Sequence, residues 1–229
     1  EMTSSLVGSE MCIRDSLCIQ ASMHTQLPAP SFSVRIWNGT PNEFLIKCAE
    51  LTRTGVGLPA YYNDEVIIPA LMSRGVTLAD AREYGIIGCV EPQKPFKTDG
   101  WHDAAFFNMC RPLELVFSNG VDKGAQISIK TGNVEDMTTF EEFYNAYKAQ
   151  ETYMIGLMVN AINAIDTAHS ERVPLPFLSC MVEDCVKEGK TVQEGGAHYN
   201  FTGPQGFGIA NMADGLWAVK TLVFDEKKV

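Results

Sequence analysis

Basic residues are scarce in this sequence. Its 18 Lys and Arg residues stand against 28 Asp and Glu residues, which gives a formal net charge of -10 at pH 7. Proteins that bind nucleic acid need clustered Lys and Arg to contact the phosphates. The charge balance therefore argues against nucleic acid as a partner, and it does not by itself indicate any other partner.

The sequence also lacks long apolar runs and regularly spaced cysteines. No apolar stretch reaches the roughly 18 residues of a membrane-spanning helix, and no secretory signal is visible at the start. The seven cysteines are an odd number, and none of them has the Cys-x-x-Cys spacing of a zinc or redox site. We therefore expect a protein of a reduced compartment, the cytoplasm, without a membrane partner or a bound metal.

The 229 residues are 45% hydrophobic and 20% charged, which is normal for a globular protein. This length suits one domain or a large part of a bigger one. Residues 1–16, EMTSSLVGSEMCIRDS, are polar and without period, and they resemble translated sequencing-adapter sequence. We exclude them from the fold prediction and expect them not to pack on the core. The remaining residues, 17–229, are interpreted as part of a longer domain.

Helix signals are clear in several places. The pattern of caps and apolar periodicity predicts helices from Asn63 (or alternatively Pro69) to Gly75, from Thr77 to Gly85, from about 104 to 118, from Thr138 to about 168, and from about 212 to 222. Strands are predicted at 32–37, within 51–60 and at 174–182, and irregular loops at 86–100 and 195–208. Strands that alternate with helices indicate an α/β fold with parallel strands.

The loop Gly88-Cys89-Val90-Glu91-Pro92 is the most informative stretch. In an extended segment, residues i and i+2 project to the same side, about 6–7 Å apart at their α-carbons. Cys89 and Glu91 are then able to face one substrate. A nucleophilic thiolate is disfavoured by the neighbouring carboxylate, whereas a neutral thiol beside a carboxylate suits hydrogen-atom transfer. The alternative is that Cys89 is a small buried apolar residue.

Several blocks of the sequence resemble one known family. The run REYGIIGCVEPQKPFKTDGWHDAAFFNM is similar to the cysteine loop of glycyl radical enzymes, the family of pyruvate formate-lyase. Three further blocks, GLPAYYNDEVIIPAL, HSERVPLPFLS and GGAHYNFTGPQG, resemble other parts of the same family in the same order. The similarity extends over most of residues 17–229.

The resemblance implies a fold and a radical chemistry. The family has a ten-stranded α/β barrel made of two half-barrels, with the cysteine loop at its centre. Cys89 is expected to carry a thiyl radical, which is formed from a glycyl radical on a glycine in a motif close to RVxGY. The sequence contains no such motif, so we interpret it as a fragment that lacks the N-terminal region and the glycyl radical domain. No other cofactor is expected to be bound.

Residues near the cysteine indicate which family members this sequence is most similar to. Pyruvate formate-lyase uses two adjacent cysteines, but Val90 follows Cys89 here. The resemblance implies that Glu91 is the base, as in members with the GCVE form that eliminate or decarboxylate. Asp103, 14 residues beyond Cys89, resembles the aspartate that binds substrate hydroxyls in the cobalamin-independent glycerol and propane-1,2-diol dehydratases.

Each supporting residue also has a structural interpretation. Asp103 precedes a predicted helix and is well placed as its N-cap. His102 is a candidate proton donor near the substrate or a structural histidine. Asn63 is a candidate substrate ligand or a helix cap, followed by the first-turn acid Asp64. His198 and Tyr199 stay unassigned, and their glycine-rich loop lacks the Lys and Ser/Thr of a phosphate-binding loop.

We therefore expect a fragment of a radical lyase that dehydrates glycerol or propane-1,2-diol. The alternatives are another glycyl radical enzyme (choline trimethylamine-lyase, arylacetate decarboxylase or a formate acetyltransferase-like member) or a non-catalytic α/β domain. The resemblance implies a small polyol substrate, a radical-SAM activating enzyme and a homodimer of the full-length protein. It also implies a cytoplasmic location, with a bacterial microcompartment as the alternative.

Overall fold

The computed structural model describes residues 9–88 and 90–228. The chain forms two compact units, which divide between Phe96 and Lys97. The first unit contains α1 (Ser9–Thr25), β1 (Ser33–Ile36), α2 (Asn42–Arg53), β2 (Ala60–Asn63), α3 (Asp64–Ser73), α4 (Leu78–Arg82), β3 (Gly85–Ile87) and β4 (Glu91–Gln93).

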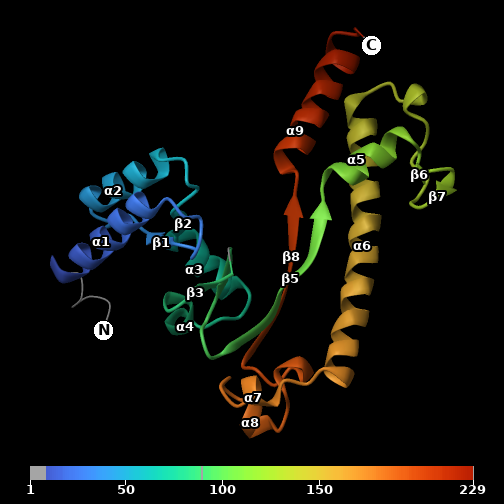
Figure 1. Cartoon of the computed structure of the whole chain (residues 1–229). Helices are drawn as coiled ribbons and strands as arrows, with labels where there is room; N and C mark the ends of the chain where they lie inside the picture. The colour runs from blue at the N-terminus through green and yellow to red at the C-terminus, as the bar shows by residue number, and fades with distance from the viewer. Residues whose placement is uncertain (1–8, 89, 229) are drawn as a thin grey trace. The chain divides into compact units, whose positions relative to one another are not determined.

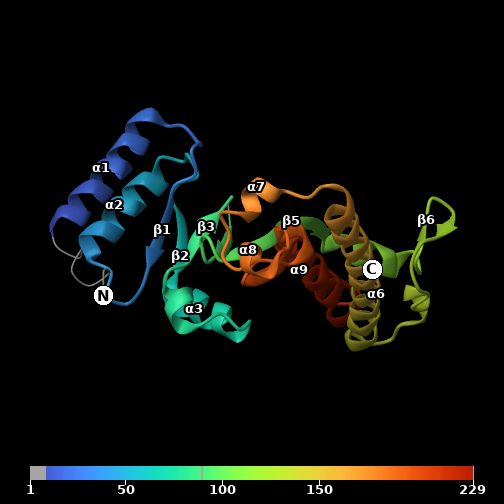
Figure 2. The same cartoon turned by 90° about the horizontal axis from the view of Figure 1, so that it is seen from below.

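The core of the first unit is small and apolar. Helices α1 and α2 lie side by side (Figure 2), and β1 and β2 form a parallel pair in the register Ser33↔Ala60. The buried residues of this core are Ile19, Val34, Cys48 and Leu51 of these elements and Leu58 of the loop between α2 and β2. Residues 9–16, which we excluded from the fold prediction, form the first turns of α1. The side chains of residues 9–15 lie outside the described part of the chain, so the expectation that this segment does not pack on the core stays a prediction.

The second unit is built around a parallel strand pair and a long helix (Figure 1). Its elements are β5 (Thr98–Asn108), α5 (Cys110–Phe117), β6 (Val121–Asp122), β7 (Ala125–Gln126), a 3-10 turn (Val134–Asp136), α6 (Phe140–Arg172), α7 (Pro176–Ser179), α8 (Cys185–Glu188), a second 3-10 turn (Val192–Glu194), β8 (Tyr199–Phe207), α9 (Ile209–Ala218) and a closing π-helix (Val219–Asp225). Strand β5 pairs with β8, and α6 runs alongside the pair (Figure 1).

The core of the second unit lies where three helices meet. Leu113 and Val116 of α5 pack against Phe143, Ala146 and Tyr147 of α6. Residues of α9 and the π-helix cover the same cluster, which is the usual way an amphipathic helix buries its apolar stripe. This cluster fixes the ends of β5 and β8, because α5 follows β5 and α9 follows β8.

The predicted fold class is supported in part. Helices occur together with parallel strand pairs, as the alternation predicted. The described strands form four two-stranded sheets, two parallel and two antiparallel, and they do not close into a barrel. The strand within 32–37 and the starts of α3 and α4 are confirmed. Pro69 lies inside α3 and does not begin it.

Several other predictions were wrong. Residues 86–100 were predicted to be irregular, but they contain β4, most of β3 and the start of β5. The loop 195–208 contains β8, and the strand 174–182 is instead the short helix α7 with turns. Residues 51–53 end α2, which the sequence analysis missed. Strands β5 and β8 were missed because they pair with each other across about 100 residues and not through local periodicity.

Candidate active site

Glu91 is the first residue of the second strand of a short antiparallel hairpin in the first unit. Strands β3 and β4 pair in the register Ile87↔Glu91, so residues 88–90 connect them. Gly88 has φ +58°, a left-handed conformation that glycine adopts without a steric penalty. A Cβ atom at position 88 would lie only 2.9 Å from Glu91 Oε2. Glycine therefore suits the backbone conformation here, and a larger residue would displace the Glu91 carboxylate.

The Glu91 side chain is only 8% exposed. The backbone N–H of Val90 donates a hydrogen bond of 3.1 Å to Glu91 Oε2, so the carboxylate folds back toward the connection that contains residue 89. Cys89 itself lies outside the described residues. The arrangement of the Cys89 thiol and the Glu91 carboxylate on one side therefore stays a prediction.

Asp103 does not cap a helix. The next helix, α5, begins only at Cys110, and Asp103 lies within strand β5. The register with β8 shifts between His102 and Ala105, which marks a β-bulge. Asp103 has φ +60° at this bulge, and its Oδ1 accepts a hydrogen bond from Gln205 Nε2 of β8. The N-cap interpretation was wrong because the helical pattern was read six residues too early, across the end of a strand.

His102 lies opposite Gly203 in the β5–β8 pair. A Cβ atom at position 203 would lie 3.6 Å from His102 Nδ1, so the imidazole lies over the glycine. His102 and Asp103 are thus neighbours in the second unit. Glu91 belongs to the first unit, and the convergence of Cys89, Glu91 and Asp103 on one cavity stays a prediction.

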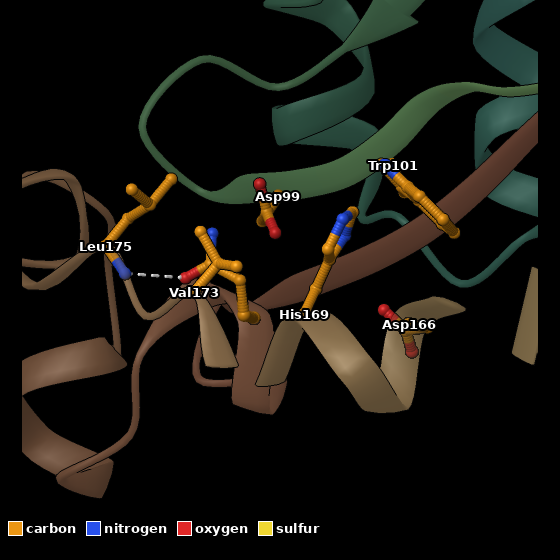
Figure 3. A pocket seen from close by; sticks show the side chains of 7 residues that line it. Asp99, Trp101, Asp166, His169, Val173 and Leu175 are labelled. Carbon is orange, nitrogen blue, oxygen red and sulfur yellow. Dashed lines mark hydrogen bonds between the residues drawn. The ribbon is translucent and has the colours of Figure 1, made fainter. Parts of the chain in front are cut away.

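A pocket of about 250 Å³ lies on another part of the second unit (Figure 3). Asp99 and Trp101 of β5 line it together with Asp166 and His169 of α6. The Trp101 and His169 rings meet edge to face at 4.8 Å. None of the sequence-predicted site residues lines this pocket, so it is distinct from the face that carries His102.

Asn63 acts as a helix cap. Its Oδ1 accepts a hydrogen bond of 3.0 Å from the backbone N–H of Glu65, the second residue of α3. Next to it, Asp64 accepts two hydrogen bonds from the Arg35 guanidinium, at 2.8 and 2.7 Å, and one from the Tyr84 hydroxyl at 2.7 Å. Burial and the bond to Asp64 raise the pKa of Tyr84. These contacts support the structural interpretation of Asn63 and Asp64, and a substrate role for Asn63 stays a prediction.

His198 and Tyr199 also have structural partners. His198 Nδ1 lies 2.6 Å from Asp184 Oδ2, and this hydrogen bond lowers the pKa of the Asp184 carboxyl. Tyr199 is buried at the start of β8, with its ring edge to face against His198. The pair therefore anchors the turn before β8 to the segment around α8.

Within residues 9–88 and 90–228, no three His, Cys, Asp or Glu side chains are grouped as a metal site would require. Over the same residues, no helix is both long and apolar enough to cross a membrane.

The chain belongs to the pyruvate formate lyase-like family, whose model matches residues 14–229. It is 66% identical, with a TM-score of 0.86, to a solved structure described for 1,2-propanediol dehydration in Roseburia inulinivorans; the match covers 93% of this chain and 27% of that one. It is 63% identical, with the same TM-score of 0.86 and the same coverage of 93% and 27%, to the glycerol-bound B12-independent glycerol dehydratase from Clostridium butyricum.

Among curated proteins, the chain is 40% identical over 214 residues to the (2S)-3-sulfopropanediol dehydratase of Klebsiella oxytoca. That match covers 93% of this chain and 26% of the relative, so the chain spans about a quarter of the relative's length. The resemblance to glycyl radical enzymes that the cysteine loop indicated is therefore confirmed.

Proposed function

We propose that the full-length protein containing this chain is a radical lyase that dehydrates glycerol or propane-1,2-diol to an aldehyde. The observation that supports it most is the identity of 63% and 66% to the two diol-related structures over 93% of the chain. The curated relative at 40% identity is named for a sulfonated propanediol, so a diol unit is common to all three. In the full-length protein we expect the chain to form part of a ten-stranded α/β barrel.

The proposed steps on the radical carbon are carried by two side chains, Cys89 and Glu91. Once it is formed, a glycyl radical would supply the radical character of the Cys89 sulfur. The Cys89 sulfur removes a hydrogen atom from the carbinol carbon, and Glu91 takes the proton from the hydroxyl on that carbon. The neighbouring hydroxyl then leaves as water, taking up one proton, which balances the proton that Glu91 took. Cys89 returns its hydrogen atom to the carbon that lost this hydroxyl, and the thiyl radical is restored. The net change is a diol to an aldehyde and one water.

Asp103 and His102 are proposed to act on the diol and not on the radical. Two carboxylates suit a substrate with two hydroxyls, and fixing both of them supplies the orientation that the elimination requires. His102 lies next to Asp103 on β5, where an imidazole is able to donate a proton to the leaving hydroxyl. Asn63 is a weaker candidate, because its side chain already accepts from the α3 backbone.

The hairpin geometry supports Glu91 as the base. A buried carboxylate beside residue 89 is able to reach a substrate held at the same connection, and water has little access to it. A glycyl radical has to be introduced by a radical-SAM activating enzyme, which we propose as a transient partner. A homodimer in the cytoplasm, or within a microcompartment, is the proposed state of the full-length protein.

The test is an assay of the full-length protein after anaerobic activation. Glycerol, propane-1,2-diol and choline are supplied separately, and aldehyde is measured together with the glycyl radical signal by electron paramagnetic resonance. We expect aldehyde from the diols and none from choline. The Cys89→Ala variant should keep the radical signal and lose turnover. A strong radical signal with no product from either diol would contradict the proposal.

A further inference from the structure

The two faces of the β5–β8 pair carry different residues. Successive side chains of a strand point to opposite faces. Asp99 and Trp101 face α6, because both line the pocket with Asp166 and His169 (Figure 3). His102 therefore points to the reverse face. Gly203, its partner on β8, lies on that face too, and so does Gln205 two residues later.

A regular strand would place Asp103 on the wrong face for substrate binding. By alternation it would join Asp99 and Trp101 on the side of α6. The bulge between His102 and Ala105 breaks this alternation, since bulges bend a strand and redirect a side chain. Asp103 takes φ +60° there, a conformation that Asp tolerates better than most residues.

Strand β8 is adapted to the bulge at the matching position. Pro204 lies opposite Ala105, the residue where pairing resumes. A proline has no backbone N–H to donate, so it is tolerated where a ladder is interrupted. The next residue, Gln205, donates its side-chain amide to Asp103 Oδ1. The Asp103 carboxylate is thus brought to the face of His102 and Gln205.

From this arrangement we infer that Gln205 is a positioning residue, which holds the Asp103 carboxylate toward the diol. The inference rests on the proposed function. An ionised carboxylate has about four acceptor sites, so one bond from Gln205 leaves capacity for substrate hydroxyls. Gln205 fixes the side-chain rotation of Asp103 before the substrate arrives, which lowers the entropy lost on binding.

The inference is tested by glycerol binding to the full-length protein without activation, so that radical chemistry is not needed. Gln205→Met keeps the side-chain size and removes the donor. We expect this variant to raise the Kd for glycerol about 10-fold, which corresponds to the loss of a hydrogen bond to a charged group. Gln205→Glu should weaken glycerol binding at least as much, and this variant replaces Gln205→Met in the test if the methionine variant does not fold. Gln193→Met is the matched control, because Gln193 accepts from the Leu175 backbone and lines the pocket on the α6 side of the strand pair.

A double-mutant cycle separates positioning from a general structural role. If Gln205 acts through Asp103, adding Gln205→Met to Asp103→Asn should weaken binding no further than Asp103→Asn alone. Losses that add, or a Gln205→Met protein that binds glycerol normally, would overturn the role of Gln205 and leave the proposed function intact. Wild-type protein that binds neither glycerol nor propane-1,2-diol would instead refute the proposed function.

Discussion

Replacing Gly88 with alanine tests the link between the β3–β4 connection and the Glu91 carboxylate. A Cβ atom at position 88 would lie 2.9 Å from Glu91 Oε2, whereas ordinary contacts begin at 3.4 Å. The carboxylate oxygen therefore has to move away by about 0.5 Å. That movement also weakens its 3.1 Å hydrogen bond from the Val90 N–H.

Gly189 provides the control for backbone strain. It has φ +64°, close to the +58° of Gly88, and no atom lies within 4 Å of a Cβ atom built there. Alanine in a left-handed conformation costs about 1–2 kcal/mol at either position. The end of a glutamate side chain is flexible, so the displacement of Glu91 adds little to the free energy of unfolding. The two variants should be similarly stable.

Their activities should differ. A misplacement of 1 Å in an active site costs about 100-fold in rate, so 0.5 Å is expected to cost about 10-fold. We expect Gly88→Ala to lower kcat for propane-1,2-diol by about that factor, and Gly189→Ala to leave it unchanged. The assay is aldehyde formation by the activated full-length protein, with thermal unfolding of both variants alongside. Equal kcat values for the two variants would refute the reasoning about Glu91.

Four further predictions concern Asp103, Thr139, Glu142 and the isolated chain. Asp103→Asn keeps a residue that tolerates φ +60° and should raise the KM for diols with little change in thermal midpoint, measured by steady-state kinetics and calorimetry. Thr139→Ala should lower stability by about 1 kcal/mol by removing the cap of α6, in chemical denaturation. The hydrogen bonds from Thr138 and Thr139 lower the pKa of Glu142 below its ordinary 4.5. The ionised Glu142 side chain therefore contributes its full stabilisation of the fold above pH 4.5. An acid titration of the free energy of unfolding should show this contribution lost as the pH falls through the lowered pKa. The 229-residue chain alone should give no aldehyde after incubation with an activating enzyme, and product above the Cys89→Ala background would contradict this.

Helix starts could be predicted from the sequence because their causes are local. Asn63 and Thr77 each accept a hydrogen bond from a backbone N–H two or three residues later, as the sequence pattern indicated. The predicted start of α6 lies one residue before the observed start. The prediction used Thr138 and Glu141, but the capping box forms between Thr139 and Glu142. Both pairs have the same spacing, so the sequence offers no local reason to choose between them.

Strands β5 and β8 could not be predicted in the same way. Their residues, TDGWHDAAFFN and YNFTGPQGF, mix polar, aromatic and glycine residues without a regular alternation. What makes them strands is a ladder between segments about 100 residues apart, in the register Thr98↔Tyr199 to Asn108↔Phe207. Local propensity carries no information about such a partner. The family resemblance was therefore the only guide to the second unit's site residues.

The position of Asp103 strengthens a functional interpretation that the sequence left open. In the sequence it was either a helix cap or a substrate ligand, and the cap explained its presence without any substrate. In the structure no helix begins there, and the residue has φ +60° inside a strand. A non-glycine residue in this conformation costs about 1–2 kcal/mol, which glycine at the same site would avoid. Strain of this kind persists where a side chain is needed for function. The bulge and Gln205 together bring the carboxylate to the face of His102, and on this ground we propose substrate binding as the role of Asp103.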